Sequence, residues 1–137
     1  MRFLLDTNVV SELRKRERAD SGLRQWFAAV EREDLALSVL ALGELRLGIF
    51  RLGRRDPQAA AHLEAWLARL ERSYQGRLLA IDSAVVEAWA RLNVARPLPV
   101  IDSLQAATAL VHGLTLVTRD VDDLAGVEVP LLNPFVD

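Results

Sequence analysis

Two aspartates follow short apolar runs of the kind that form buried strands. Asp6 comes directly after Phe3–Leu5, and Asp120 comes just after residues 114–118, LTLVT. In open α/β sheets, functional sites form outside the carboxyl ends of parallel strands. A single aspartate in such a place is commonly a helix cap or a turn former, so neither residue indicates a site by itself.

Glu44 lies within an apolar segment that predicts a largely buried helix over residues 39–52. Its neighbours three and four residues away along that helix are all Leu, Ala or Gly. Because an isolated buried charge is too costly, we expect the Glu44 carboxylate to be paired, metal-bound or protonated. Arg51, two turns further on, is the alternative ion-pair partner.

Asp102 opens a helix predicted over residues 100–112, where the helix dipole favours an anion. The residues that follow include Ala106, Ala107 and Ala109, whose small side chains would let this helix approach the sheet closely. We therefore expect Asp102 to lie beside Asp6.

Carboxylates that converge in this way must be neutralised. Two like charges about 4 Å apart repel by on the order of 4 kcal/mol at an effective dielectric constant of 20. Either some of the acids hold protons, or a divalent cation lies among them. Oxygen ligands without a nearby His or Cys favour Mg²⁺ or Mn²⁺.

The elements that must position these acids alternate along the chain. Strands are predicted over residues 3–5, 35–38, 77–82, 114–118 and 129–135. Helices are predicted after Asp6 with Thr7 or Asn8 as the cap, and over residues 20–33, 39–52, 59–74, 83–95 and 100–112, with Asp82 capping the fifth and Gly113 ending the last. Such alternation implies parallel βαβ units. We predict one α/β domain over residues 1–137, a three-layer sandwich with a central, mostly parallel sheet of about five short strands.

The composition argues against several classes of protein. A formal net charge of -2 does not suit a protein that coats nucleic acid by charge alone. The absence of cysteine excludes disulfides and thiolate metal sites. No apolar stretch reaches the roughly 18 residues of a membrane span, and a charge comes too early for a signal-peptide core. We expect a soluble, cytoplasmic protein.

Four stretches together resemble a known family: LLDTNVVSEL, GEL around Glu44, PLPVIDSLQAATALVHGLTLVTRDVDDL, and the terminal LLNPF. They are similar to PIN-domain toxins of the VapC type, in particular the FitB-like branch, and the resemblance spans essentially the whole chain. It implies an endoribonuclease that depends on Mg²⁺ or Mn²⁺ and is the toxin of a toxin–antitoxin pair.

The resemblance also implies roles for individual residues. Asp6 and Asp102 match the principal metal ligands of the family, and Glu44 matches its helix acid. The fourth acid is Asp120, with Asp123 as its alternate. The polar residues Asn8 and Thr118 match positions that orient ligands or water. Basic residues that could contact RNA phosphates are Arg14, Lys15, Arg51, Arg54, Arg55 and Arg119.

The partners implied by the resemblance are RNA, a second copy of the chain and a cognate VapB-like antitoxin that carries the operator-binding domain. An Arg or Lys of the antitoxin could enter the acidic pocket and displace the metal. The apolar surfaces of the helices predicted over 39–52 and 59–74 suit dimerisation or antitoxin binding.

Other families fit less well. A haloacid-dehalogenase-like phosphatase needs a second acid where Asn8 stands, and a phosphoreceiver domain needs a late lysine, whereas Lys15 is the only lysine. The alternative that we retain is a non-catalytic PIN module that only binds partners.

Overall fold

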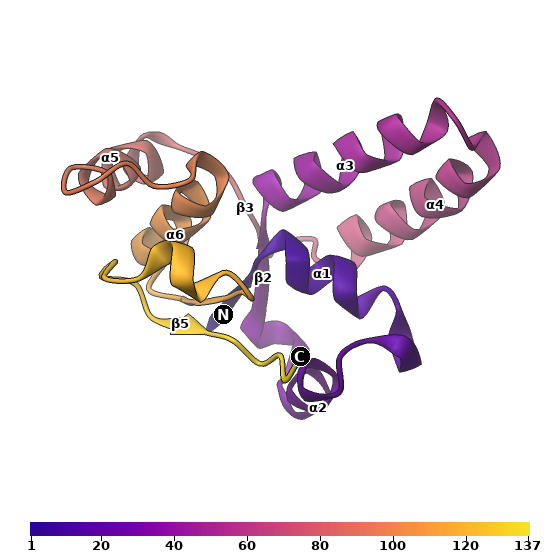
Figure 1. Ribbon diagram of the computed structural model, residues 1–137, viewed down its shortest axis with the longest axis horizontal. Coiled ribbons are helices and arrows are strands. Elements are labelled where there is room, and N and C mark those ends of the chain that lie inside the picture. Colours follow the sequence, from indigo (N-terminus) through magenta and orange to yellow (C-terminus); the bar gives the residue numbers. More distant parts are fainter.

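The protein contains a five-stranded sheet with helices on both faces (Figure 1), in a computed structural model that describes all 137 residues. The strands are β1 Phe3–Leu5, β2 Leu35–Ser38, β3 Leu78–Leu79, β4 Thr115–Val117 and β5 Leu131–Leu132. Their order is β3-β2-β1-β4-β5, and every neighbouring pair is parallel. The predicted α/β sandwich with a parallel sheet is confirmed.

Six α-helices connect the strands. They are α1 Thr7–Leu13, α2 Ser21–Ala29, α3 Val39–Gly53, α4 Pro57–Ser73, α5 Ser83–Leu92 and α6 Val100–His112. Three of them match the prediction closely, whereas α2 and α5 end earlier than predicted. Gly113 adopts φ 67° and ends α6, as expected. None of the helices is both long and apolar enough to cross a bilayer.

Alternating side chains of the central strands build two cores, one on each face of the sheet. Leu4 and Leu116 pack with Ala106 of α6 on one face. Leu5 packs with Val9 of α1 on the other face. All five side chains are fully buried, and each buried leucine contributes about 2 kcal/mol by the hydrophobic effect. This packing holds α1 and α6 at fixed positions on opposite sides of β1.

The helices α3 and α4 lie side by side and extend away from the sheet (Figure 1). Ile49, Ala60 and Leu67 are buried between them. The prediction that α3 is largely buried is wrong, because only one of its sides meets α4 and the body of the protein. Leu47 and Phe50 of α3 are 47% and 64% exposed.

The cap of α1 also differs from the prediction. Asp6, rather than Thr7 or Asn8, is the N-cap: its backbone is extended (φ -69°, ψ 158°), and its Oδ1 accepts a hydrogen bond from the Thr7 amide at 2.7 Å. The chain thus remains extended through Asp6 and turns into the helix at Thr7. Asp82 caps α5 as predicted, accepting from the Val85 amide at 3.0 Å.

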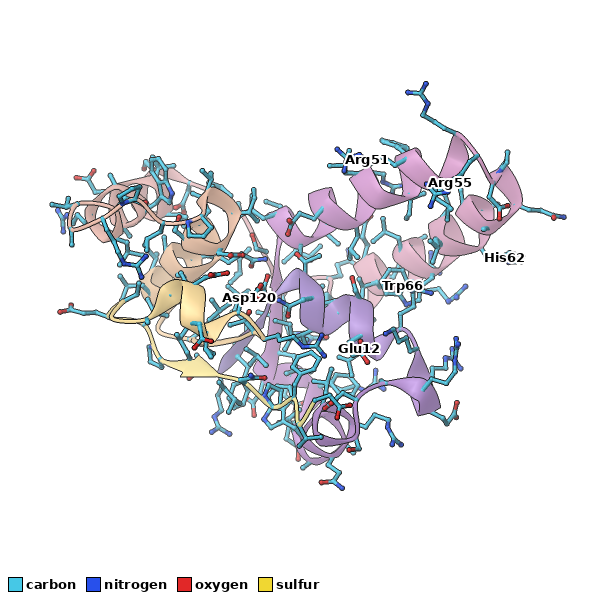
Figure 2. The ribbon with its side chains drawn as sticks, in the orientation of Figure 1. Glu12, Arg51, Arg55, His62, Trp66 and Asp120 are labelled. Atoms are coloured by element: carbon cyan, nitrogen blue, oxygen red, sulfur yellow. The ribbon has the colours of Figure 1, made fainter.

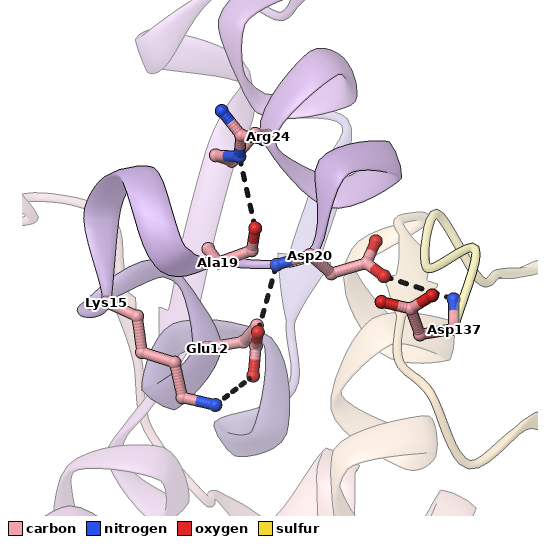
Figure 3. A network of polar contacts seen from close by, with 6 residues as sticks. All are labelled: Glu12, Lys15, Ala19, Asp20, Arg24 and Asp137. Atoms are coloured by element: carbon pink, nitrogen blue, oxygen red, sulfur yellow. Dashed lines mark hydrogen bonds and ion pairs between the residues drawn. The ribbon is translucent and has the colours of Figure 1, made fainter.

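A polar network ties the end of α1 to the start of α2 and to the C-terminus (Figure 3). Glu12 pairs with Lys15, with 2.9 Å between Oε1 and Nζ, and accepts from the Asp20 amide at 2.9 Å. Asp20 in turn accepts from the Asp137 amide at 3.1 Å. The contacts fix the segment between α1 and α2 against the body of the protein.

Candidate active site

Three carboxylates meet at the carboxyl end of the sheet. Asp6 follows β1, Asp120 follows β4 next to it, and Asp102 lies in the first turn of α6. One carboxylate oxygen of each lies within 4.8 Å of the others. The parallel pairing of β1 with β4 and the close packing of α6 on the sheet explain why residues so distant in sequence converge.

Asp6 is buried and held by four donors. Its Oδ1 accepts from the Thr7 amide and, at 3.2 Å, from Gln105 Nε2. Its Oδ2 accepts from Thr118 Oγ1 at 2.6 Å and from Asn8 Nδ2 at 3.3 Å. Burial nevertheless raises the Asp6 pKa above its usual value, with the charges of nearby acids adding to the effect. The Asp6 carboxylate is therefore fixed in place by hydrogen bonds, but no cation of the protein neutralises its charge.

Asn8 and Thr118 link Asp6 to Asp120. Asn8 Nδ2 donates to Asp120 Oδ2 at 2.9 Å, and its Oδ1 accepts from the Arg119 amide at 3.3 Å. Thr118 Oγ1 accepts from the Asp120 amide at 3.0 Å. The two polar residues therefore hold the turn after β4 in position.

Gln105 is part of the site, and the sequence reasoning missed it. Its side chain is fully buried, and Nε2 donates to Asp6 and, at 3.5 Å, to Thr7 Oγ1. Its Oε1 is buried without any hydrogen-bond partner. The available signal was its position three residues after Asp102, on the same face of α6.

Asp102 has no neutralising partner. Its side chain makes no hydrogen bond or ion pair, and it is half-buried. Burial, together with the charges of Asp6, Asp120, Asp123 and Glu44, raises the Asp102 pKa to about 6. Burial is the largest cause of this rise and the four neighbouring acids add to it, while no cation of the protein pairs with Asp102 to oppose it.

Glu44 lies at the edge of this group. It is exposed, which contradicts the expected burial, because α3 turns this side toward the opening beside α1. Thr7 Oγ1 donates to Glu44 Oε1 at 2.5 Å. Neither Arg51 nor any other cation forms an ion pair with it. Glu44 is therefore joined to Asp6 through Thr7 and Gln105 but lies outside the three converging carboxylates.

The alternate fourth acid, Asp123, is exposed and is not one of the three converging acids. Its charge still helps to raise the Asp102 pKa. The geometry thus brings Asp120, and not Asp123, next to Asp6 and Asp102.

The basic candidates are placed differently from one another. Arg14 and Arg55 line a hollow of about 320 Å³ between α1 and the α3–α4 pair, which also contains Thr7 and Glu44. Lys15 is engaged by Glu12, and the Arg119 guanidinium lies 3.9 Å from the centre of the Phe135 ring. Arg51, in the last turn of α3, is exposed (Figure 2), and so is Arg54, the residue that follows this helix.

The donor set of the three acids fits a hard divalent cation. Every candidate ligand atom is a carboxylate oxygen, no lysine or arginine pairs with these acids, and repulsion at 4.8 Å amounts to about 3 kcal/mol per pair. Such ligands suit Mg²⁺ or Mn²⁺. Asp6, Asp102 and Asp120 are the residues that could hold the ion.

Residues 3–128 match the family model of the PIN domain, and the chain belongs to this family. It is 32% identical over 144 residues to Toxin FitB of Neisseria gonorrhoeae, covering 98% of this chain and 99% of that protein. It is 39% identical over 102 residues to Ribonuclease VapC4 of Mycobacterium tuberculosis, covering 71% and 75%. The predicted family is confirmed.

The solved structures agree with the sequence relatives. The crystal structure of FitAcB from Neisseria gonorrhoeae matches with a TM-score of 0.87 and 30% identity, covering 96% of this chain and 97% of that chain. The structure of FitAB bound to the IR36 DNA fragment matches with a TM-score of 0.86 and 28% identity. The chain therefore adopts the fold of these relatives over nearly all of its length.

Proposed function

We propose that this protein is an endoribonuclease that requires Mg²⁺ or Mn²⁺ and acts as the toxin of a toxin–antitoxin pair. The observation that carries the proposal is the convergence of Asp6, Asp102 and Asp120 without a cationic partner. The names of two relatives, a toxin and a ribonuclease, support it. A protein of this kind acts in the cytoplasm, where its RNA substrates are.

The reaction would be hydrolysis of an RNA phosphodiester bond by water. Asp6, Asp102 and Asp120 would hold a divalent cation, whose positive charge would lower the pKa of water and stabilise negative charge on the phosphate. Asp6 is kept in one orientation by its four donors. Glu44 Oε2, which has no partner in the protein, would accept a hydrogen bond from the attacking water.

Basic residues would bind the RNA backbone. Arg14 and Arg55 lie in the hollow that contains Thr7 and Glu44, where a strand entering the site would pass. Guanidinium groups pair well with phosphate oxygens. Arg119 would lie near the cut bond, since its amide contacts Asn8.

The proposed partners follow from the same features. The acidic group could accept an Arg or Lys from a VapB-like antitoxin, which would replace the cation and stop the reaction. The exposed apolar side chains Leu47 and Phe50 of α3 suit contact with the antitoxin or with a second copy of the chain in a homodimer. Operator DNA would be bound through the antitoxin.

Cleavage of purified RNA tests the enzymatic proposal. We expect the purified protein to cut RNA with Mg²⁺ or Mn²⁺, to stop when EDTA is added, and to resume with excess Mn²⁺, because the three acids repel one another without an ion. Cleavage that persists in EDTA would contradict the metal requirement. RNA left intact under every condition would favour the non-catalytic PIN module.

A further inference from the structure

A second hollow, of about 370 Å³, lies between α1, α2 and α4 and contains none of the converging acids. Four arginines from three parts of the chain line it: Arg14 and Arg16 just after α1, Arg32 after α2, and Arg69 of α4. None of the four guanidinium groups forms an ion pair, although other arginines of the chain do. Four unpaired cations around one hollow favour an anionic ligand, and guanidinium groups match phosphate best.

Arg16 is held in a strained conformation at this hollow. Its φ is 55°, and it is the only residue other than glycine with a positive φ. A bulky side chain rarely occupies this left-handed region, and such strain persists where a functional position requires it. Arg16 is one of the residues that line the hollow.

The rest of the lining is mostly apolar: three aromatic residues line the hollow together with Leu5, Val10, Leu13 and Leu70. Trp66 and Phe27 are half-buried and line the hollow, and Figure 2 shows Trp66 on the side of α4 that faces α1. Tyr74 is only 8% exposed, and its hydroxyl makes no hydrogen bond within the protein. Arg77 lies over the Tyr74 ring at 4.8 Å and so occupies one face of that ring. Arginines beside an aromatic wall are the usual means of binding single-stranded nucleic acid.

The arginine-lined hollow continues toward the acids. The hollow between α1 and the α3–α4 pair has Thr7 and Glu44 in its lining and shares Arg14 and Trp66 with the arginine-lined hollow. A chain that lies at the carboxylates can therefore pass along α1 into the second hollow. Because both hollows border α1, one extended strand could occupy both of them.

We propose that the arginine-lined hollow binds one nucleotide of a single-stranded RNA, at a distance along the strand from the bond that is cut. The arginines hold its phosphate, and Trp66 or Phe27 stacks on its base. This inference rests on the proposed function, since it assigns part of the substrate to a second site. Its volume suits one nucleotide-sized group.

Two arginines on α4 provide a matched test. Arg69 lines the hollow, whereas Arg72 is exposed on the same helix outside it. Each is changed to Gln in an inactive Asp102→Asn protein, and binding of a fluorescein-labelled oligouridylate is followed by anisotropy at several salt concentrations. We expect Arg69→Gln to weaken binding by about 3- to 10-fold at low salt and to reduce the salt slope by about 0.7, the value for one phosphate contact on a single strand. Arg72→Gln should change neither.

Arg16→Gly separates binding from folding. Glycine accepts a φ of 55° without strain, so we expect an unchanged or higher melting temperature together with weaker RNA binding. A variant that lost affinity only because it unfolded would show the opposite change in melting temperature.

The other outcomes are distinct. Equal effects of the Arg69 and Arg72 changes, or no effect of either, would overturn the nucleotide site. So would intact RNA binding combined with lost binding of the antitoxin, which would assign the hollow to the protein partner. If Asp102→Asn without any further change bound no RNA at low salt, that result would contradict the proposed function itself and therefore this site as well.

Discussion

Asp102→Asn is expected to lower the rate of RNA cleavage by about 100- to 1,000-fold while the fold persists. Asparagine keeps the shape of the side chain but removes one of three charges that meet within 4.8 Å. A bound divalent ion contributes several kcal/mol to the transition state, and each 1.36 kcal/mol corresponds to a factor of ten. Initial rates on a defined RNA, measured at saturating Mn²⁺, give the ratio.

Asp82→Asn is the matched control for this change. Asp82 caps α5 and is not one of the three converging acids, and asparagine caps a helix as well as aspartate does. Its cleavage rate should equal that of the unchanged protein. A similar loss in both variants, or a loss below tenfold in Asp102→Asn, would show that Asp102 has no special part in the reaction.

Asp102→Asn should also be more stable than the unchanged protein when metal is absent and the pH is neutral. Because the Asp102 pKa is raised to about 6, the folded protein binds a proton more tightly than the unfolded chain, whose Asp pKa is near 3.9. Stability therefore falls as the pH rises from about 4 to about 6, and the full penalty remains above that range. This loss of folding stability is about 1 kcal/mol once solvent screening of a half-buried group is allowed for.

Melting curves in EDTA measure this difference. At pH 7.5 Asp102→Asn should melt about 2–5 °C higher than the unchanged protein. Near pH 4 the difference should become small, because folded Asp102 is then protonated and the unfolded chain, with an Asp pKa near 3.9, is about half protonated. A lower melting temperature at pH 7.5 would instead assign Asp102 a structural role.

Ala106→Leu is expected to impair both the fold and the site. Ala106 is fully buried where α6 packs on Leu4 and Leu116. Extra carbons in a packed core cost about 1–3 kcal/mol, and they would push α6 away from β1 and carry Asp102 away from Asp6. A displacement of about 1 Å at a reacting centre can cost 100-fold in rate, so cleavage should fall even where the protein remains folded.

Ala90→Leu makes the same change at an exposed position of α5. It should leave stability within about 0.5 kcal/mol, as surface substitutions usually do. Urea unfolding and cleavage rates of both variants, measured below the transition, separate the two effects. Full activity in a destabilised Ala106→Leu would contradict the role of this close approach in placing Asp102.

Segments with an unambiguous local pattern were predictable from the sequence. The strands β1 and β2 and the helix α6 have the predicted bounds, because short apolar runs and a glycine stop signal are local features. The approach of α6 to the sheet also followed from its small residues. Asp6 directly follows β1 and Asp102 lies in the first turn of α6, so the places of these two acids in the fold were predictable from local patterns.

Features that depend on distant neighbours were not predictable. The apolar pattern of α3 does not reveal that this helix extends away from the sheet together with α4. For this reason the sequence predicts a buried Glu44, whereas Glu44 is exposed. Gln105 stands among alanines as an ordinary helical residue until α6 is placed beside Asp6. The arginine-lined hollow brings Arg14 and Arg16 together with Arg32 and Arg69, whose separations in the sequence give no hint of this proximity.

The most direct measurement is the anomalous X-ray signal of crystals grown or soaked with Mn²⁺. We expect a peak in contact with carboxylate oxygens of Asp6, Asp102 and Asp120, and its loss in crystals of Asp6→Asn. A protein that cleaves RNA but shows no peak at these residues, or a peak bound elsewhere, would contradict the claim that the three acids form the metal site.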